Sequence, residues 1–268
     1  CDADDVLNNT IGCGLGVLLC TWSDLMILKK WEELPDFMRT EEVRPYYEAL
    51  KKKRLSLILK RAMDLVGGIV LLVLLAIPMA IIAVMIKLDS EGPVFYRQER
   101  ISTYGKHFKI HKFRTMVSNA DKIGTAVTVG NDSRITMVGA KLRGCRLDEL
   151  PQVLDLITGD MSFVGTRPEA VKYVEKYEPE YYATLLLPAG ITSEASIRYK
   201  DEAELLEAAV DVDKVYMEEV LPGKMKYNLE SIKDFSFIGE IKTMFRTVFA
   251  VLGKDYSDEE QESTVTRK

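Results

Sequence analysis

The longest apolar segment of the chain runs from residue 65 to residue 86 and has 22 consecutive residues without a charge. A helix of about 20 apolar residues is long enough to cross the core of a bilayer. A buried core helix is the alternative, but the length of the segment and its freedom from charge favour a membrane helix.

Basic residues flank this segment on both sides. Because basic residues in short flanks mark the cytoplasmic side of a membrane, both ends of the helix are expected there. Pro78 lies inside the segment, where it removes a backbone hydrogen bond and bends a helix. The pattern therefore favours a re-entrant helix, broken at Pro78, over a spanning one. The flanking cations are Lys51, Lys52, Lys53, Arg54, Lys60 and Arg61 before the segment, and Lys87, Arg97, Arg100, Lys106, Lys109, Lys112 and Arg114 after it.

A β-hairpin is predicted next, with strands at residues 93–101 and 107–115 and a turn at residues 102–105. Alternation places Phe108, Ile110, Lys112 and Arg114 on one face of the second strand. Two cations then continue an apolar face. That face could begin an anion pocket, or the cations could be solvated charges at a strand end.

Two helices are predicted beyond a polar loop at residues 117–135. The first spans residues 138–145. The second has Asp148 as its N-cap, Pro151 in its first turn and Gly159 as its stop. Its apolar face consists of Leu150, Val153, Leu154 and Ile157.

The pattern becomes less regular towards the C-terminus. Residues 161–168 suggest a short extended piece and a loop, followed by a helix opened by Pro168. A turn is expected at residues 188–190. Residues 237–252 have helical apolar spacing, which fits either core packing or a helix lying in a membrane interface.

Composition excludes several classes of protein. A net charge of -5 argues against nucleic acid as a partner. The four cysteines form no CxxC pair, and two histidines are too few for a His-based metal cluster. We therefore expect free thiols and no zinc site.

Asp148 and Glu149 are the candidate chemical centre. A helix N-terminus carries partial positive charge, which favours an ionised carboxylate and attracts phosphate. Together with nearby arginines, it should lower the pKa of Asp148. The simpler interpretation is that Asp148 only caps a helix, and these residues alone favour it.

Seven motifs in order resemble one family. They are KRAMD (60–64), GPVFYRQER (92–100), KFRTM (112–116), NDSRIT (131–136), LDELPQ (147–152), MSFVGTRPE (161–169) and PAGIT (188–192). Over residues 60–252 the chain resembles the monotopic phosphoglycosyl transferases, bacterial sugar transferases that initiate exopolysaccharide and glycoconjugate synthesis.

The resemblance implies transfer of sugar-1-phosphate from a UDP-sugar to polyprenyl (undecaprenyl) phosphate, with release of UMP and use of Mg²⁺. It implies a ping-pong mechanism in which Asp148 is the nucleophile and Glu149 helps to hold the metal. Phosphate-binding roles are carried over to Lys112, Arg143 and Arg167. Arg114 is a further candidate from the hairpin face, and Arg198 is the less certain match.

Three positions depart from the family pattern. Ile77-Pro78 replaces Ser-Pro at the helix break, and Thr166-Arg167-Pro168 replaces Pro-Arg-Pro. After Thr192 the usual Gly-Trp-Ala-Gln continuation is absent. We expect that region to bear on sugar choice, so the sugar stays open. Two rival hypotheses are a glycosyltransferase that releases UDP and a non-catalytic membrane scaffold.

The predicted fold is α+β: a mostly helical, membrane-associated domain with a small hairpin, a re-entrant helix and interfacial amphipathic helices. Its expected location is the cytoplasmic face of the bacterial inner membrane. Homo-oligomers and contacts with downstream glycosyltransferases stay open. The expected divisions are an extension (1–40), the basic lead-in and membrane helix (41–90), a catalytic domain (91–200), C-terminal helices (201–252) and a charged tail (253–268).

Overall fold

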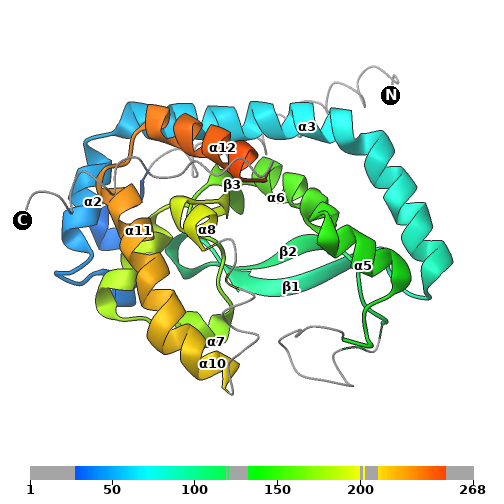
Figure 1. Ribbon diagram of the computed structural model, residues 1–268. Coiled ribbons are helices and arrows are strands. Elements are labelled where there is room, and N and C mark those ends of the chain that lie inside the picture. Colours follow the sequence, from blue (N-terminus) through cyan, green and yellow to red (C-terminus); the bar gives the residue numbers. More distant parts are fainter. Residues whose placement is uncertain (1–27, 119, 121–131, 200–201, 203–210, 252–268) are drawn as a thin grey trace, which may run out of the picture.

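The structure is a computed structural model that describes residues 28–118, 120, 132–199, 202 and 211–251. This part of the chain is mostly helical, with two small two-stranded sheets (Figure 1). The expectations for residues 1–27, for most of the 117–135 loop, for residues 203–210 and for the tail lie outside the described residues.

Helix α3 (Arg54–Asp89) is the longest element, with 36 residues that include Pro78. It contains the predicted apolar segment and part of the basic lead-in, of which α2 (Arg44–Lys51) forms the rest. In the described part of the chain, α3 alone is long and apolar enough to cross a membrane. Figure 1 shows that it runs across the top of the molecule and then bends downward towards β1. An interior proline accounts for a bend.

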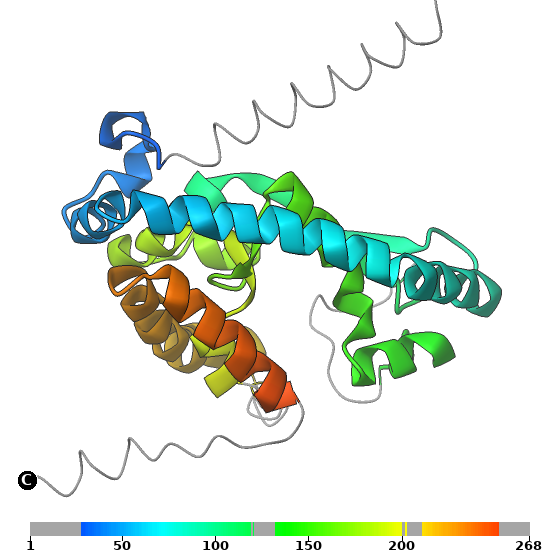
Figure 2. The ribbon, with the colours of Figure 1, turned by 90° about the horizontal axis from the view of Figure 1, so that it is seen from above.

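Both ends of α3 are fixed to the same body of the protein. Near its start, Lys60 donates to the carbonyl of Val164 over 2.5 Å and pairs with Glu240. At its end, a carboxylate oxygen of Asp89 accepts from the backbone N–H of Val138 over 3.1 Å. The helix therefore follows the body along its length, as the view from above also shows (Figure 2).

The predicted hairpin is confirmed. Strand β1 (Phe95–Ile101) pairs antiparallel with β2 (His107–Phe113), with Tyr96 opposite Lys112. The turn is the short helix η3 (Thr103–Gly105), in which Gly105 has a φ of 76°. Since β2 ends at Phe113, Arg114 lies beyond the strand.

A second sheet was missed from the sequence. Strand β3 (Met161–Val164) pairs in parallel with β4 (Ala189–Thr192), so the predicted turn at residues 188–190 is wrong. The backbones of Gly165 and Gly190 cross so closely that a Cβ on Gly190 would lie 2.2 Å from Gly165. These glycines therefore permit the contact, and do not mark a turn.

The remaining helices are mostly short. After β2 come α5 (Met137–Gly144), η4 (Leu147–Gln152) and α6 (Val153–Thr158), then α7 (Val171–Val174), which starts three residues after the predicted Pro168. The C-terminal part contains η5 (Pro179–Leu186), α8 (Glu194–Arg198), α10 (Val212–Val215), η6 (Tyr216–Val220), α11 (Leu221–Lys233) and α12 (Phe237–Val251). Two further short helices, η1 (Trp31–Glu33) and η2 (Asp36–Met38), precede α2.

Two apolar clusters stabilise the fold. One joins α2, η5 and α11, with Leu50, Leu186 and Met225 almost fully buried. The other joins the inner face of α3 to the hairpin and α6 through Ile86, Phe113 and Leu156. The second cluster therefore fixes the hairpin against η4 and α6, the segment that carries Asp148 and Glu149.

Candidate active site

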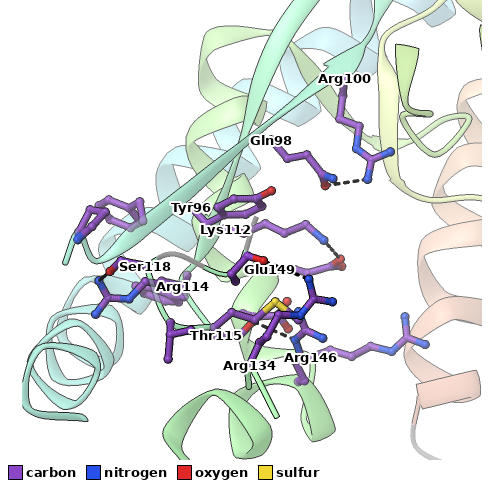
Figure 3. Close-up of a pocket in the computed structure, with 18 residues that line it drawn as sticks. Tyr96, Gln98, Arg100, Lys112, Arg114, Thr115, Ser118, Arg134, Arg146 and Glu149 are labelled. Carbon is purple, nitrogen blue, oxygen red and sulfur yellow. Dashed lines mark hydrogen bonds and ion pairs between the residues drawn. The ribbon is translucent and has the colours of Figure 1, made fainter. Parts of the chain in front are cut away.

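A cavity of about 550 Å³ lies between the hairpin, α5 and η4 (Figure 3). Its wall is rich in cations and also contains both carboxylates of the Asp148–Glu149 pair. The lining residues that carry a charge are Arg100, Lys112, Arg114, Arg134, Arg143, Arg146, Asp148 and Glu149. A cavity lined in this way suits a polyanionic ligand.

The two carboxylates lie in an irregular turn. Helix η4 begins at Leu147, after Arg146 in the left-handed region (φ 54°), so Asp148 is its second residue and caps nothing. The predicted N-cap role is therefore wrong. Pro151 has no N–H to donate back to Leu147, which prevents a regular α-helix from starting here. Helix α6 then begins at Val153 and ends as predicted at Gly159 (φ 83°).

Glu149 is held by two cations. Nζ of Lys112 and Nη2 of Arg167 both donate to its Oε1, over 2.7 Å and 2.8 Å. Burial opposes ionisation of this side chain, but the charges and hydrogen bonds of Arg167 and Lys112 outweigh it. They lower the pKa of Glu149 to about 2. Glu149 is therefore an anion across the physiological pH range.

Asp148 has a different environment. Within the described part of the chain, no cation forms an ion pair with it. Burial raises its pKa above the usual aspartate value, and neighbouring Glu149 adds to this effect, while Lys112 and Arg143 oppose it. The expectation of a lowered pKa is therefore wrong, because burial outweighs the opposing charges of Lys112 and Arg143. Asp148 is left as an unpaired carboxylate at the cavity wall.

The other predicted phosphate-binding residues divide into two groups. Arg143 lines the cavity and donates from Nε to Thr115 over 2.8 Å. Arg114 also lines it, but its Nη2 donates to the carbonyl of Ser90 over 2.7 Å at the end of α3. Arg198 is not among the lining residues; it lies on α8 and pairs with Glu194. The phosphate-binding roles stay predictions.

Comparison with known proteins identifies the family. Residues 55–254 match the profile described as bacterial sugar transferase, which is well over half of the chain. The chain belongs to the bacterial sugar transferase family.

Several curated members of this family are similar to the chain. The UDP-glucose:undecaprenyl-phosphate glucose-1-phosphate transferase of Escherichia coli K12 is 40% identical over 197 residues, which cover 72% of this chain and 40% of that protein. The UDP-N-acetylgalactosamine-undecaprenyl-phosphate N-acetylgalactosaminephosphotransferase of Aeromonas hydrophila is 32% identical over 197 residues, covering 72% and 44%. A UDP-glucose:undecaprenyl-phosphate glucose-1-phosphate transferase of Caulobacter vibrioides is 34% identical over 200 residues, covering 73% and 70%. The chain thus matches less than half the length of the first two relatives.

Sequence reasoning had given no site role to four residues that line the cavity: Gln98, Arg100, Arg134 and Arg146. Gln98, Arg100 and Arg134 lie within the quoted motifs, and Arg146 directly precedes one of them. Alternation along β1 puts Gln98 and Arg100 on the same face as Tyr96, which pairs with Lys112. That signal could have found them. Arg146 lines the cavity with its backbone in the left-handed region, a conformation for which the sequence gives no signal.

The carboxylates of this sugar transferase site fit a Mg²⁺ ion. Among the described residues Asp148 has no ion pair, and Lys112 and Arg167 both use Oε1 of Glu149 and not Oε2. Mg²⁺ typically takes one or two carboxylates and completes its shell with water and substrate phosphate. No cluster of three His, Cys, Asp or Glu side chains exists among the described residues, so a site built from protein groups alone is absent there.

Proposed function

We propose that the chain transfers sugar-1-phosphate from a UDP-sugar to polyprenyl phosphate and releases UMP. The observation that carries this proposal is the unpaired carboxylate of Asp148, next to an ion-paired Glu149, in a cation-lined cavity. The names of the relatives support the same substrates, although their sugars differ between glucose and N-acetylgalactosamine. Which sugar this chain transfers therefore has to be measured.

The chemistry would proceed in two displacements at one phosphorus atom. A carboxylate oxygen of Asp148 attacks the β-phosphorus of the UDP-sugar, and the bond to the bridging oxygen breaks, so UMP leaves with that oxygen. An oxygen of polyprenyl phosphate then attacks the same phosphorus, and the Asp148 carboxylate departs. This order gives a ping-pong reaction through an aspartyl-phosphosugar intermediate.

The surrounding residues have roles that follow from their positions. Lys112, Arg143 and Arg167 would offset the negative charge of the phosphates as UMP departs. The charges of Lys112 on β2 and Arg143 on α5 act on Asp148, whereas Arg167, in the loop after β3, contacts Glu149. Glu149, with Asp148, would hold Mg²⁺, which when bound neutralises phosphate charge.

The exposed surface supports a membrane location. The outer face of α3 has exposed apolar residues, among them Val73 (71% exposed) and Ile77 (74%). Both ends of α3 are fixed to one body, so a spanning topology would put parts of that body on opposite sides of the bilayer. We propose a re-entrant α3 broken at Pro78, at the cytoplasmic face of the inner membrane, which brings the site to its lipid acceptor.

Helix α12 extends this surface. It packs beside α3, and Ile238, Phe245 and Val248 are exposed, so core packing does not explain its apolar spacing (Figure 2). Exposed apolar faces of this kind suit the interface between lipid headgroups and acyl chains. We propose that α12 lies in that interface, and that the chain catalyses the first membrane step of exopolysaccharide or glycoconjugate synthesis.

Product identity tests the proposed function. The purified chain, in detergent or vesicles, is incubated with undecaprenyl phosphate, Mg²⁺ and each of a panel of UDP-sugars. Release of UMP with one or more sugars supports it. Release of UDP would favour a transferase that moves the sugar alone, and absence of turnover with every sugar would favour a non-catalytic scaffold.

A further inference from the structure

Arg100 is a cavity residue that the proposed mechanism does not use. It lies on β1 on the same face as Tyr96 and Gln98, and all three line the cavity (Figure 3). Its side chain is partly buried, and burial lowers the pKa of its guanidinium. Nearby Arg167 lowers that pKa further, while the charge of Glu169 opposes both effects. A cation in such a place is costly unless an anion accompanies it.

The protein itself provides Arg100 with little compensation. Its Nη2 donates to Oε1 of Gln98 over 2.7 Å, and within the described residues no other hydrogen bond or ion pair involves its guanidinium. Gln98 is neutral, so it orients the group without neutralising it. Glu169, the nearby carboxylate, instead accepts from the hydroxyl of Tyr216 over 2.5 Å and from Lys224 over 3.5 Å.

The contrast with the other cations is informative. Lys112 and Arg167 share the carboxylate of Glu149, and Arg198 pairs with Glu194. Arg100 has no such carboxylate among the described residues, although it lines the cavity together with Lys112. Its remaining N–H groups form a planar fork, which matches two oxygens of a phosphoryl group.

We propose that Arg100, oriented by Gln98, binds a phosphoryl oxyanion of a substrate at that end of the cavity where β1 forms the wall. This inference rests on the proposed function, and it adds a subsite that none of the motif-based assignments includes. The oxyanion could belong to the donor diphosphate or to the acceptor monophosphate, and the two arms of the experiment below separate these sources.

Three variants and a control test the subsite. Arg100→Ala removes the cation, Arg100→Lys keeps the charge but loses the fork, and Gln98→Ala frees the guanidinium. Arg97→Ala is the matched control, because Arg97 lies on the other face of the same strand, is exposed and is absent from the cavity wall. Melting temperatures show whether each variant folds. If Arg100→Ala does not fold, Gln98→Ala still tests the subsite.

KM is measured separately for the UDP-sugar and for undecaprenyl phosphate, through UMP release. A lost charge-assisted hydrogen bond is worth about tenfold or more in binding. We expect Arg100→Ala to raise one KM by at least about tenfold, Gln98→Ala to raise the same KM by less, and Arg97→Ala to leave both unchanged. An increase for the UDP-sugar assigns the donor, and one for the lipid assigns the acceptor. Unchanged KM values in folded Arg100 and Gln98 variants would overturn the subsite.

Calorimetry of UMP and of UDP-sugar binding distinguishes failure of the Arg100 subsite from failure of the proposed function. If wild-type chain releases no UMP, the proposed function fails by itself. In that case the affinity for undecaprenyl phosphate in vesicles is measured as well. A loss of affinity for the nucleotide or for the lipid phosphate in Arg100→Ala, but not in Arg97→Ala, still supports an oxyanion site at Arg100, and equal affinities for both ligands overturn it.

Discussion

Two adjacent carboxylates with similar chemistry have opposite environments in this protein. Asp148 has a raised pKa because it is partly buried and unpaired, whereas Glu149 has a pKa of about 2 because Lys112 and Arg167 hold it. Pairs of titratable groups whose environments separate their pKa values commonly divide the roles in a reaction. Here the division leaves Asp148 accessible and Glu149 fixed as an anion.

The environment of Glu149 predicts how stability depends on pH. The pKa of a glutamate in an unfolded chain is about 4.3. Because the folded pKa is lower, the ion pairs stabilise the fold above that value, and their contribution is lost as the pH falls towards 2. In buffer with EDTA, the melting temperature of wild type should exceed that of Glu149→Gln near neutral pH. This difference should shrink between about pH 5 and pH 2, and a constant difference would contradict the assignment.

At the scale of elements, one buried contact fixes the hairpin to α6, which directly follows the segment that carries Asp148 and Glu149. Asp155 on α6 is 1% exposed and accepts from both the backbone N–H and the Nδ1 of His111, over 2.9 Å and 2.6 Å. His111 precedes Lys112 on β2. The contact therefore helps to hold β2, and with it Lys112, against the segment that carries Glu149.

Removal of Asp155 should destabilise the protein. Asp155→Ala leaves a buried N–H without a partner, which costs about 1–3 kcal/mol. Asp155→Asn keeps an oxygen for that N–H and should cost less. The control is Asp213→Ala, which removes an exposed ion pair with Lys172 worth about 0–1 kcal/mol. Chemical denaturation measures all three, and equal losses for Asp155→Ala and Asp213→Ala would show that the buried contact contributes little.

The topology of α3 is testable by labelling. If α3 is re-entrant, single cysteines at Leu55 and Phe95 should both react with an impermeant thiol reagent from the cytoplasmic side only. Both positions are exposed, at 69% and 39%, so accessibility to water does not limit the reaction. The other cysteines must first be replaced by serine. Reaction of the two positions from opposite sides would establish a spanning helix.

Local elements were predictable from the sequence, and non-local ones were not. The β1–β2 hairpin followed from alternation and a nearby turn, and α3 from its uninterrupted apolar segment. The β3–β4 pair was missed because its strands are far apart in sequence and short. The motif pointed to Asp148, which lines the cavity, but its pKa was misjudged, since burial depends on tertiary structure.

At the scale of the whole molecule, α12 packs against α3 (Figure 2), and both helices have exposed apolar side chains. The cation-lined cavity lies between α5, η4 and the hairpin. Helix α5 and the hairpin pack on α3, and η4 is connected to α3 by way of α6, which also packs on it. This arrangement brings a site for phosphate chemistry to a surface suited to lipid. It supports the proposed reaction, in which a soluble donor and a lipid acceptor meet at the membrane.

The most direct test of the central claim is the release of UMP in the absence of acceptor. Wild-type chain, mixed with its UDP-sugar and Mg²⁺ but no polyprenyl phosphate, should release UMP in a burst stoichiometric with enzyme and gain the mass of one sugar phosphate. Asp148→Asn should show neither change while still binding membranes. A burst that persists in Asp148→Asn, or UMP release that requires the lipid acceptor, would contradict Asp148 as the nucleophile.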